Sequence, residues 1–68
     1  MYGEIIKNYL DENGIKYSFV AQEAGIPTNI FSAMLNLKRK ITVEEYFNIC
    51  LVLKVDANYF AEKVKQAV

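Results

Sequence analysis

The sequence has almost none of the residues that hold small proteins together through covalent bonds or metals. Its 68 residues include one cysteine, Cys50, and no histidine. A disulfide within the chain is therefore impossible, and a zinc site of the cysteine and histidine kind has no ligands. A chain of this length buries only about 60% of the surface that its unfolded form exposes. We therefore expect one domain, residues 1–68, stabilised by regular packing of secondary structure.

Long apolar runs are also missing. Runs such as residues 50–53 are far shorter than the roughly 18 residues that a membrane-spanning helix needs. Glu4 and Lys7 interrupt the first apolar stretch, which argues against a signal peptide. A lone thiol without an export signal is typical of the reducing cytoplasm, and we expect a cytoplasmic location. The apolar content of 53% excludes intrinsic disorder.

The residues of common catalytic and cofactor sites are scarce as well. The sequence contains no histidine, no glycine-rich phosphate loop and no cluster of metal ligands. Cys50 lies on an apolar helical face, where a buried structural role is favoured over a reactive thiol. We expect no enzymatic activity, no cofactor and no metal ion, and no small-molecule ligand is evident.

The spacing of apolar residues is helical throughout, and no segment alternates with the period of a strand. Three glycines and one proline leave few places to break a helix. The pattern predicts an all-α domain of five helices, over about residues 2–13, 17–24, 28–37, 43–53 and 57–66.

Local signals mark the ends of these helices. Gly14 can take the left-handed conformation that ends a helix, and Gly25-Ile26-Pro27 forms a three-residue turn. Thr42 followed three residues later by Glu45 is a capping box. Asp56 can cap the last helix.

Charge is balanced in sum but uneven along the chain. Eight Lys and Arg residues face eight Asp and Glu residues, so the net charge is zero. Residues 25–43 contain no acid, and the tripeptide Lys38-Arg39-Lys40 lies within them. The sum argues against a nucleic-acid partner, whereas the distribution gives the chain one basic end.

The order of small, glycine and apolar residues around the first turn resembles the phage-repressor family (Cro/CI, or Xre). The residues that carry the resemblance are Val20, Ala21, Gly25, Ile26, Phe31 and Met34. In that family a small residue lets the two motif helices approach, a glycine makes the turn, and apolar residues pack beneath. The resemblance thus assigns structural roles to Ala21, Gly25, Phe31 and Met34.

The resemblance extends over about residues 5–60 and implies a compact lambda-repressor-like domain with a helix-turn-helix motif at about 17–36. Leu37 stands where many members have glycine, and Lys16 and Pro27 stand where many have Ser or Thr. In such domains the second motif helix, here about 28–36, lies in the major groove of duplex DNA.

The resemblance implies two sets of DNA contacts. Base contacts fall on Thr28, Asn29, Ser32 and Ala33. Phosphate contacts fall on Tyr17, Asn36, Lys38, Arg39 and Lys40. The alternatives are a solvated helix face for the first set and a solubilising loop for the tripeptide.

The fourth helix carries more apolar residues than one face can bury. A useful operator needs two subunits. One interpretation of the additional apolar residues is therefore a homodimer interface formed by the last two helices. Its candidate residues are Phe47, Leu51, Val64 and Val68. The alternative is a wide core face with one or two exposed apolar residues.

Two functions from different classes remain. The first is a sequence-specific, duplex-DNA-binding transcriptional regulator that acts as a homodimer and, as the family resemblance implies, as a repressor. The second is a protein–protein interaction module that keeps the helix-turn-helix fold without DNA, which the zero net charge and the short side chains of residues 28–36 favour.

Overall fold

Helices account for most of residues 2–66, which are the residues that the computed structural model describes. The five helices are α1 (Tyr2–Glu12), α2 (Tyr17–Ala24), α3 (Thr28–Leu35), α4 (Val43–Leu53) and α5 (Asn58–Gln66). No strand occurs within residues 2–66, and the prediction of an all-α chain is confirmed. No helix in this range is long and apolar enough to cross a membrane.

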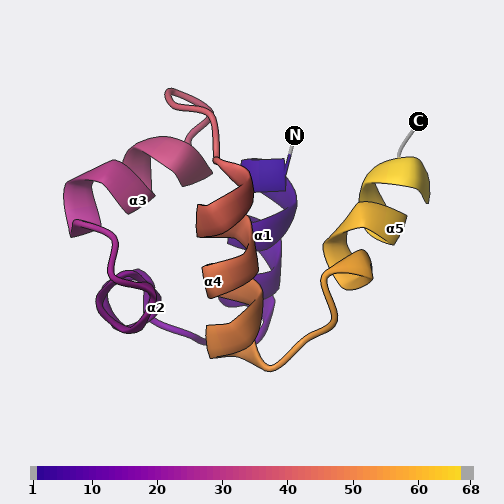
Figure 1. The fold of residues 1–68 in the computed structure, drawn as a ribbon, viewed down its shortest axis with the longest axis horizontal. Helices are drawn as coiled ribbons and strands as arrows, with labels where there is room; N and C mark the ends of the chain where they lie inside the picture. Colours follow the sequence, from indigo (N-terminus) through magenta and orange to yellow (C-terminus); the bar gives the residue numbers. More distant parts are fainter. Residues whose placement is uncertain (1, 67–68) are drawn as a thin grey trace.

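The helices pack around α1 and α4 at the centre of the molecule. Helices α2 and α3 lie on one side of this pair and α5 lies on the other (Figure 1). α3 packs against α1 and α2, α2 also contacts α4, and α5 packs against α1. The radius of gyration of 10.8 Å matches the roughly 11 Å expected for a folded chain of this length.

Every helix contributes at least one fully buried apolar side chain to a single core. The largest of these are Phe31, Phe60, Ile6, Leu10, Met34, Leu35, Ile49 and Val20. Cys50 is also buried, as the sequence predicts, and burial raises the pKa of its thiol. The core is continuous from α3 to α5, so the position of each helix depends on the others.

An aromatic cluster attaches α5 to the rest of the molecule. The Phe60 ring meets the rings of Tyr9, Tyr46 and Tyr59 at centroid distances of 5.5, 6.4 and 5.1 Å, each close to perpendicular. Such edge-to-face pairs stabilise beyond the area that they bury. The Tyr46 hydroxyl also donates a hydrogen bond to the Ala57 carbonyl, which ties α4 to the start of α5.

The first four helices end in the same way, and this corrects two predicted boundaries. Each is followed by a residue of positive φ: Gly14 (64°), Gly25 (71°), Leu37 (61°) and Lys54 (59°). The next amide then donates back across the last turn, as from Ile26 to the Ala21 carbonyl at 2.9 Å. This conformation ends α1 at Glu12 instead of residue 13, and α3 at Leu35 instead of residue 37.

The starts of the last two helices depend on side-chain caps. Thr42 Oγ1 accepts from the Glu45 amide at 3.2 Å, and Glu45 Oε1 accepts from the Thr42 amide at 3.0 Å, which confirms the capping box. Asp56 Oδ1 accepts from the Asn58 amide at 2.9 Å. α5 therefore begins at Asn58, one residue later than predicted.

Candidate nucleic-acid interface

The α2–turn–α3 unit presents one side of α3 and buries the other. Ala21, Phe31 and Met34 are fully buried, and Gly25 takes the left-handed conformation that reverses the chain. Ala21 has no exposed surface, so a larger side chain there requires its neighbours to move. The turn and the buried face together fix which side of α3 points outward.

The outward side of α3 carries four short side chains. Thr28 and Asn29 are exposed, and Ser32 and Ala33 are half-buried. They follow one another at the spacing of a single helical face, opposite Phe31 and Met34. The four residues that the sequence predicts as base contacts are thus brought together on one accessible surface.

Helices α2 and α3 begin without a side-chain cap. Lys16 and Pro27 occupy the N-cap positions, and neither forms a side-chain cap hydrogen bond. The amide groups of each first turn are therefore open to an outside acceptor. Such amides, together with the helix dipole, attract anions such as phosphate.

Tyr17, expected to contact phosphate, already has a partner. Its hydroxyl donates a 2.6 Å hydrogen bond to Asp11 Oδ1. This bond, together with desolvation and the negative charge of Asp11, raises the pKa of Tyr17. The carboxylate also brings negative charge to the start of α2, which opposes an approaching phosphate.

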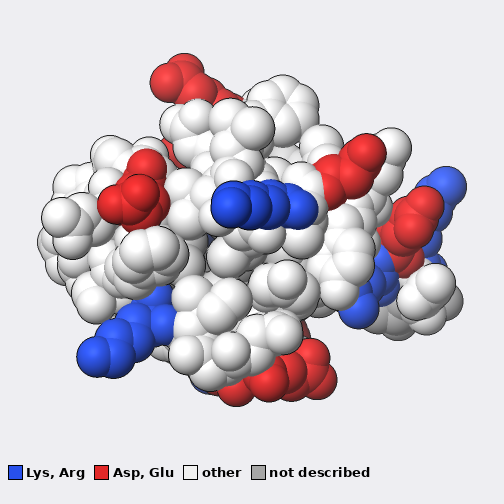
Figure 2. Space-filling model, turned by 90° about the horizontal axis from the view of Figure 1, so that it is seen from below, with Lys and Arg blue, Asp and Glu red and all other residues white. Residues whose placement is uncertain are grey.

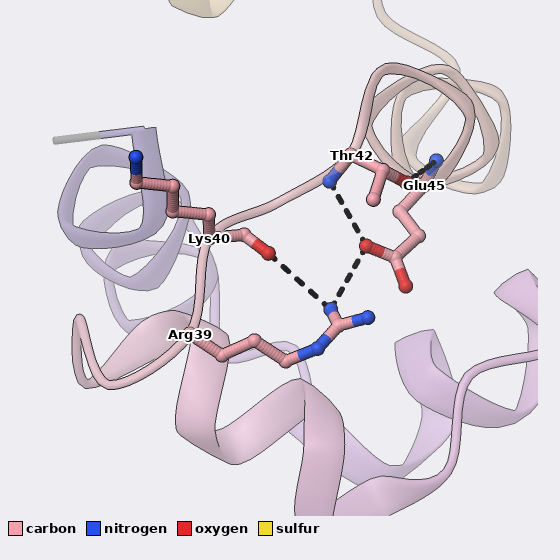
Figure 3. A network of polar contacts seen from close by, with 4 residues as sticks. All are labelled: Arg39, Lys40, Thr42 and Glu45. Atoms are coloured by element: carbon pink, nitrogen blue, oxygen red, sulfur yellow. Dashed lines mark hydrogen bonds and ion pairs between the residues drawn. The ribbon is translucent and has the colours of Figure 1, made fainter.

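Arg39, in the loop between α3 and α4, is likewise engaged. Its Nη1 lies 2.9 Å from Glu45 Oε1 and 3.3 Å from the Lys40 carbonyl oxygen. Figure 3 shows the Arg39 side chain reaching across the loop to the first turn of α4, while the Lys40 side chain points away from this network. The Arg39 hydrogen bond, followed by the cap with Thr42, lowers the pKa of Glu45 to about 2.

Sequence reasoning predicts the capping role of Glu45 but misses its pairing with Arg39. The sequence signal for this pairing is the position of Glu45: it lies in the first turn of a helix, and that helix comes shortly after a basic loop. The pairing leaves Lys38 and Lys40 as the exposed cations of the tripeptide without an ion pair within residues 2–66.

Asn36 acts on its own helix. Its Nδ2 donates to the Ser32 carbonyl at 3.0 Å and lies 3.4 Å from Ser32 Oγ. The side chain therefore helps to end α3, and it also contacts the Ser32 hydroxyl oxygen. To contact a phosphate, the Asn36 amide group must give up its hydrogen bond to the Ser32 carbonyl oxygen.

Away from α3 and the basic loop, the surface carries both acidic and basic side chains. Figure 2 shows the face seen from below, where acidic and basic side chains are interspersed, some adjacent at the right edge and others isolated by uncharged surface. By contrast, the chain from Gly25 through Val43 is free of acidic residues and contains α3 and the basic loop. The segment without acidic residues therefore consists of α3 and the loops beside it.

The candidate dimer residues on α4 are strongly exposed. Phe47 and Leu51 are 50% and 75% exposed, and Val43, one turn before Phe47, is 70% exposed. We call these three residues the α4 stripe. Val64 is half-buried on α5, and Val68 lies outside the described residues.

Comparisons with known proteins leave the site to be interpreted from its own geometry. No family model matches the sequence, and no curated protein or solved structure gives a significant match. Within residues 2–66, no group of three or more Cys, Asp or Glu side chains is placed to hold a metal ion.

Proposed function

We propose that this domain binds duplex DNA and regulates transcription, with α2 and α3 acting as a helix-turn-helix motif of the lambda-repressor type. One observation carries the proposal: α3 exposes Thr28, Asn29, Ser32 and Ala33 on one side, between uncapped helix starts and a basic loop. A helix presented in this way fits the major groove, whose width of about 12 Å admits one helix.

The side chains of α3 define a modest base-reading surface. Asn29 has the geometry to pair with both hydrogen-bonding atoms of adenine, and Ala33 or the Thr28 methyl group suits a thymine methyl. Ser32 can serve a base or a phosphate. Because no Arg or Gln extends from this side, guanine reading by α3 is weak.

Phosphate binding falls to Lys38, Lys40 and the open amides of α2 and α3. Arg39 joins them only by leaving Glu45, and Tyr17 only by leaving Asp11. With so few contacts a monomer binds weakly, and a homodimer on a pseudo-palindrome supplies the affinity. The extents of 30 × 25 × 23 Å allow two contacting copies to occupy major grooves about 34 Å apart.

Repression is the regulatory outcome that this surface supports best. A bound dimer blocks a promoter by occupancy alone. Activation requires in addition a contact with the transcription machinery, whereas repression requires the DNA-binding surface alone.

A second candidate is a protein–protein interaction module. The α4 stripe favours it, since exposed apolar residues spaced four apart on one helix suit a helical partner. The zero net charge and the engagement of Arg39 and Tyr17 also favour it.

Fluorescence anisotropy with random duplex DNA over a range of salt separates the two. DNA binding makes the logarithm of affinity fall linearly with the logarithm of salt, with a slope near −0.9 per phosphate contact. The double variant Lys38→Gln, Lys40→Gln then reduces the slope by about 2. The control Lys54→Gln, Lys65→Gln removes the same charge elsewhere and leaves it unchanged. No binding at low salt favours the protein partner.

A further inference from the structure

A groove of about 690 Å³ opens where the start of α1, the end of α3 and the start of α4 meet around the basic loop. Its walls are mainly apolar, with Tyr2, Leu37, Ile41, Val43 and Tyr46 among the lining residues. Leu37 and Val43 are 55% and 70% exposed, so both side chains are available to an occupant. The volume falls within the range of small-molecule sites.

The charge of the groove has one sign. Among the described residues that line it, Lys38, Arg39 and Lys40 are the charged ones, and none is Asp or Glu. The Arg39 guanidinium is paired with Glu45, whereas no ion pair of Lys38 or Lys40 occurs within residues 2–66. An apolar groove with two such cations at its edge is complementary to a molecule with an apolar body and one anionic end.

The backbone at Leu37 holds an apolar residue in a conformation that favours glycine. Leu37 has φ 61°, a conformation that a residue with a Cβ adopts less readily than glycine does. The equivalent position after α2 is filled by Gly25. The positive-φ position that ends α3 thus places an exposed apolar side chain in the groove.

We propose that the groove binds a small amphipathic organic acid, with its apolar body against Leu37, Val43 and Tyr2 and its carboxylate facing Lys38 and Lys40. This site is separate from the outer side of α3 and does not require DNA binding. Only one consequence rests on the proposed function: because the acid occupies the two lysines assigned to phosphate, it weakens binding to DNA.

Decanoate, kept below its micelle concentration, is a suitable probe. We expect saturable amide shifts in a ¹H–¹⁵N spectrum at residues 2–3, 37–43 and 46. The cation decyltrimethylammonium, with the same apolar body, should bind at least about tenfold more weakly, as expected for the loss of a charge-assisted contact. Equal affinity for the two probes, no saturable binding, or shifts centred on Phe47 and Leu51 would each overturn the proposal.

Two variants separate binding from folding. Leu37→Gly keeps the positive φ, relieves its strain and removes the apolar wall, so decanoate should bind several-fold more weakly to a protein that is no less stable. Lys54→Gly relieves the same strain away from the groove and should bind decanoate as the parent does. Unchanged affinity in Leu37→Gly would contradict the site. Because these titrations contain no DNA, they stand whether or not the domain binds duplexes.

Discussion

Gly3 of α1 lies directly against the backbone of Met34 in α3. A Cβ placed on Gly3 would be 2.1 Å from the Met34 carbonyl oxygen and 3.1 Å from its carbonyl carbon. Real Cβ atoms do not approach so closely, and the backbone of α3 cannot yield as a flexible side chain can. The absence of a side chain at Gly3 therefore sets how near α1 approaches the end of α3 and the groove beside it.

The substitution Gly3→Ala should destabilise the fold although alanine is the better helix former. The added methyl forces α1 and α3 apart, and overpacking of this kind costs about 1–3 kcal/mol. Urea unfolding monitored by circular dichroism measures the change. Asn8→Ala, at an exposed position of the same helix, should change the free energy of unfolding by less than about 0.5 kcal/mol. Equal stability of Gly3→Ala and the parent would contradict the close contact.

The substitution Lys54→Gly should stabilise the protein. Lys54 has φ 59° at the end of α4, where the amide of Val55 donates to the Cys50 carbonyl at 3.1 Å. Glycine takes this conformation without a steric penalty, and the gain should be about 1 kcal/mol. Thermal unfolding tests it, with Lys54→Ala as the control that removes the charge but keeps the strain. A loss of stability in Lys54→Gly would count against the assigned conformation.

Glu45 should make stability depend on pH in the acid range. Its folded-state pKa is lowered from 4.5 to about 2, first by the Arg39 hydrogen bond and then by the Thr42 cap. The stabilisation is therefore complete above pH 4.5 and is lost as pH falls toward 2. Urea unfolding across this window should show a steeper loss for the parent than for Glu45→Gln. Parallel curves would show that Glu45 has no favoured charged state.

Most of the fold follows from local rules that the sequence displays. Helical periodicity predicts all five helices, and Gly14, Gly25 and the Thr42–Glu45 cap mark boundaries because their chemistry is local. The end of α4 at Leu53 is predicted correctly, but the end of α3 is not. The positive φ of Leu37 and Lys54 has no signal in the sequence, because neither residue type favours it. Tertiary packing imposes that conformation on residues that would avoid it in isolation.

The candidate site is only partly predictable for the same reason. Which side of α3 faces outward follows from the spacing of Phe31 and Met34. The pairings of Arg39 with Glu45 and of Tyr17 with Asp11 join residues six apart across a turn or loop. Such pairings depend on how the loop folds. The composition alone does not show which charged or polar side chains already have a partner. The close approach at Gly3 is equally invisible until α1 and α3 are placed.

Leu51→Glu should weaken self-association if two copies meet through the α4 stripe. Leu51 is 75% exposed, so a charge there leaves the core intact but repels its symmetry mate. The dimer dissociation constant should rise at least about tenfold, which corresponds to 1.4 kcal/mol. Sedimentation equilibrium measures it, with Gln22→Glu on exposed α2 surface as the charge-matched control. A parent protein that stays monomeric at high concentration would remove α4 as an interface.

The proposed contact between the outer side of α3 and DNA is tested most directly by an amide footprint. Titration of ¹⁵N-labelled protein with duplex DNA at low salt should shift Thr28, Asn29, Ser32 and Ala33 most, with Lys38 and Lys40 beside them. The chemical shifts of the α5 amides should not change. Shifts confined to the α4 stripe, or a spectrum that does not change with DNA, would contradict the account.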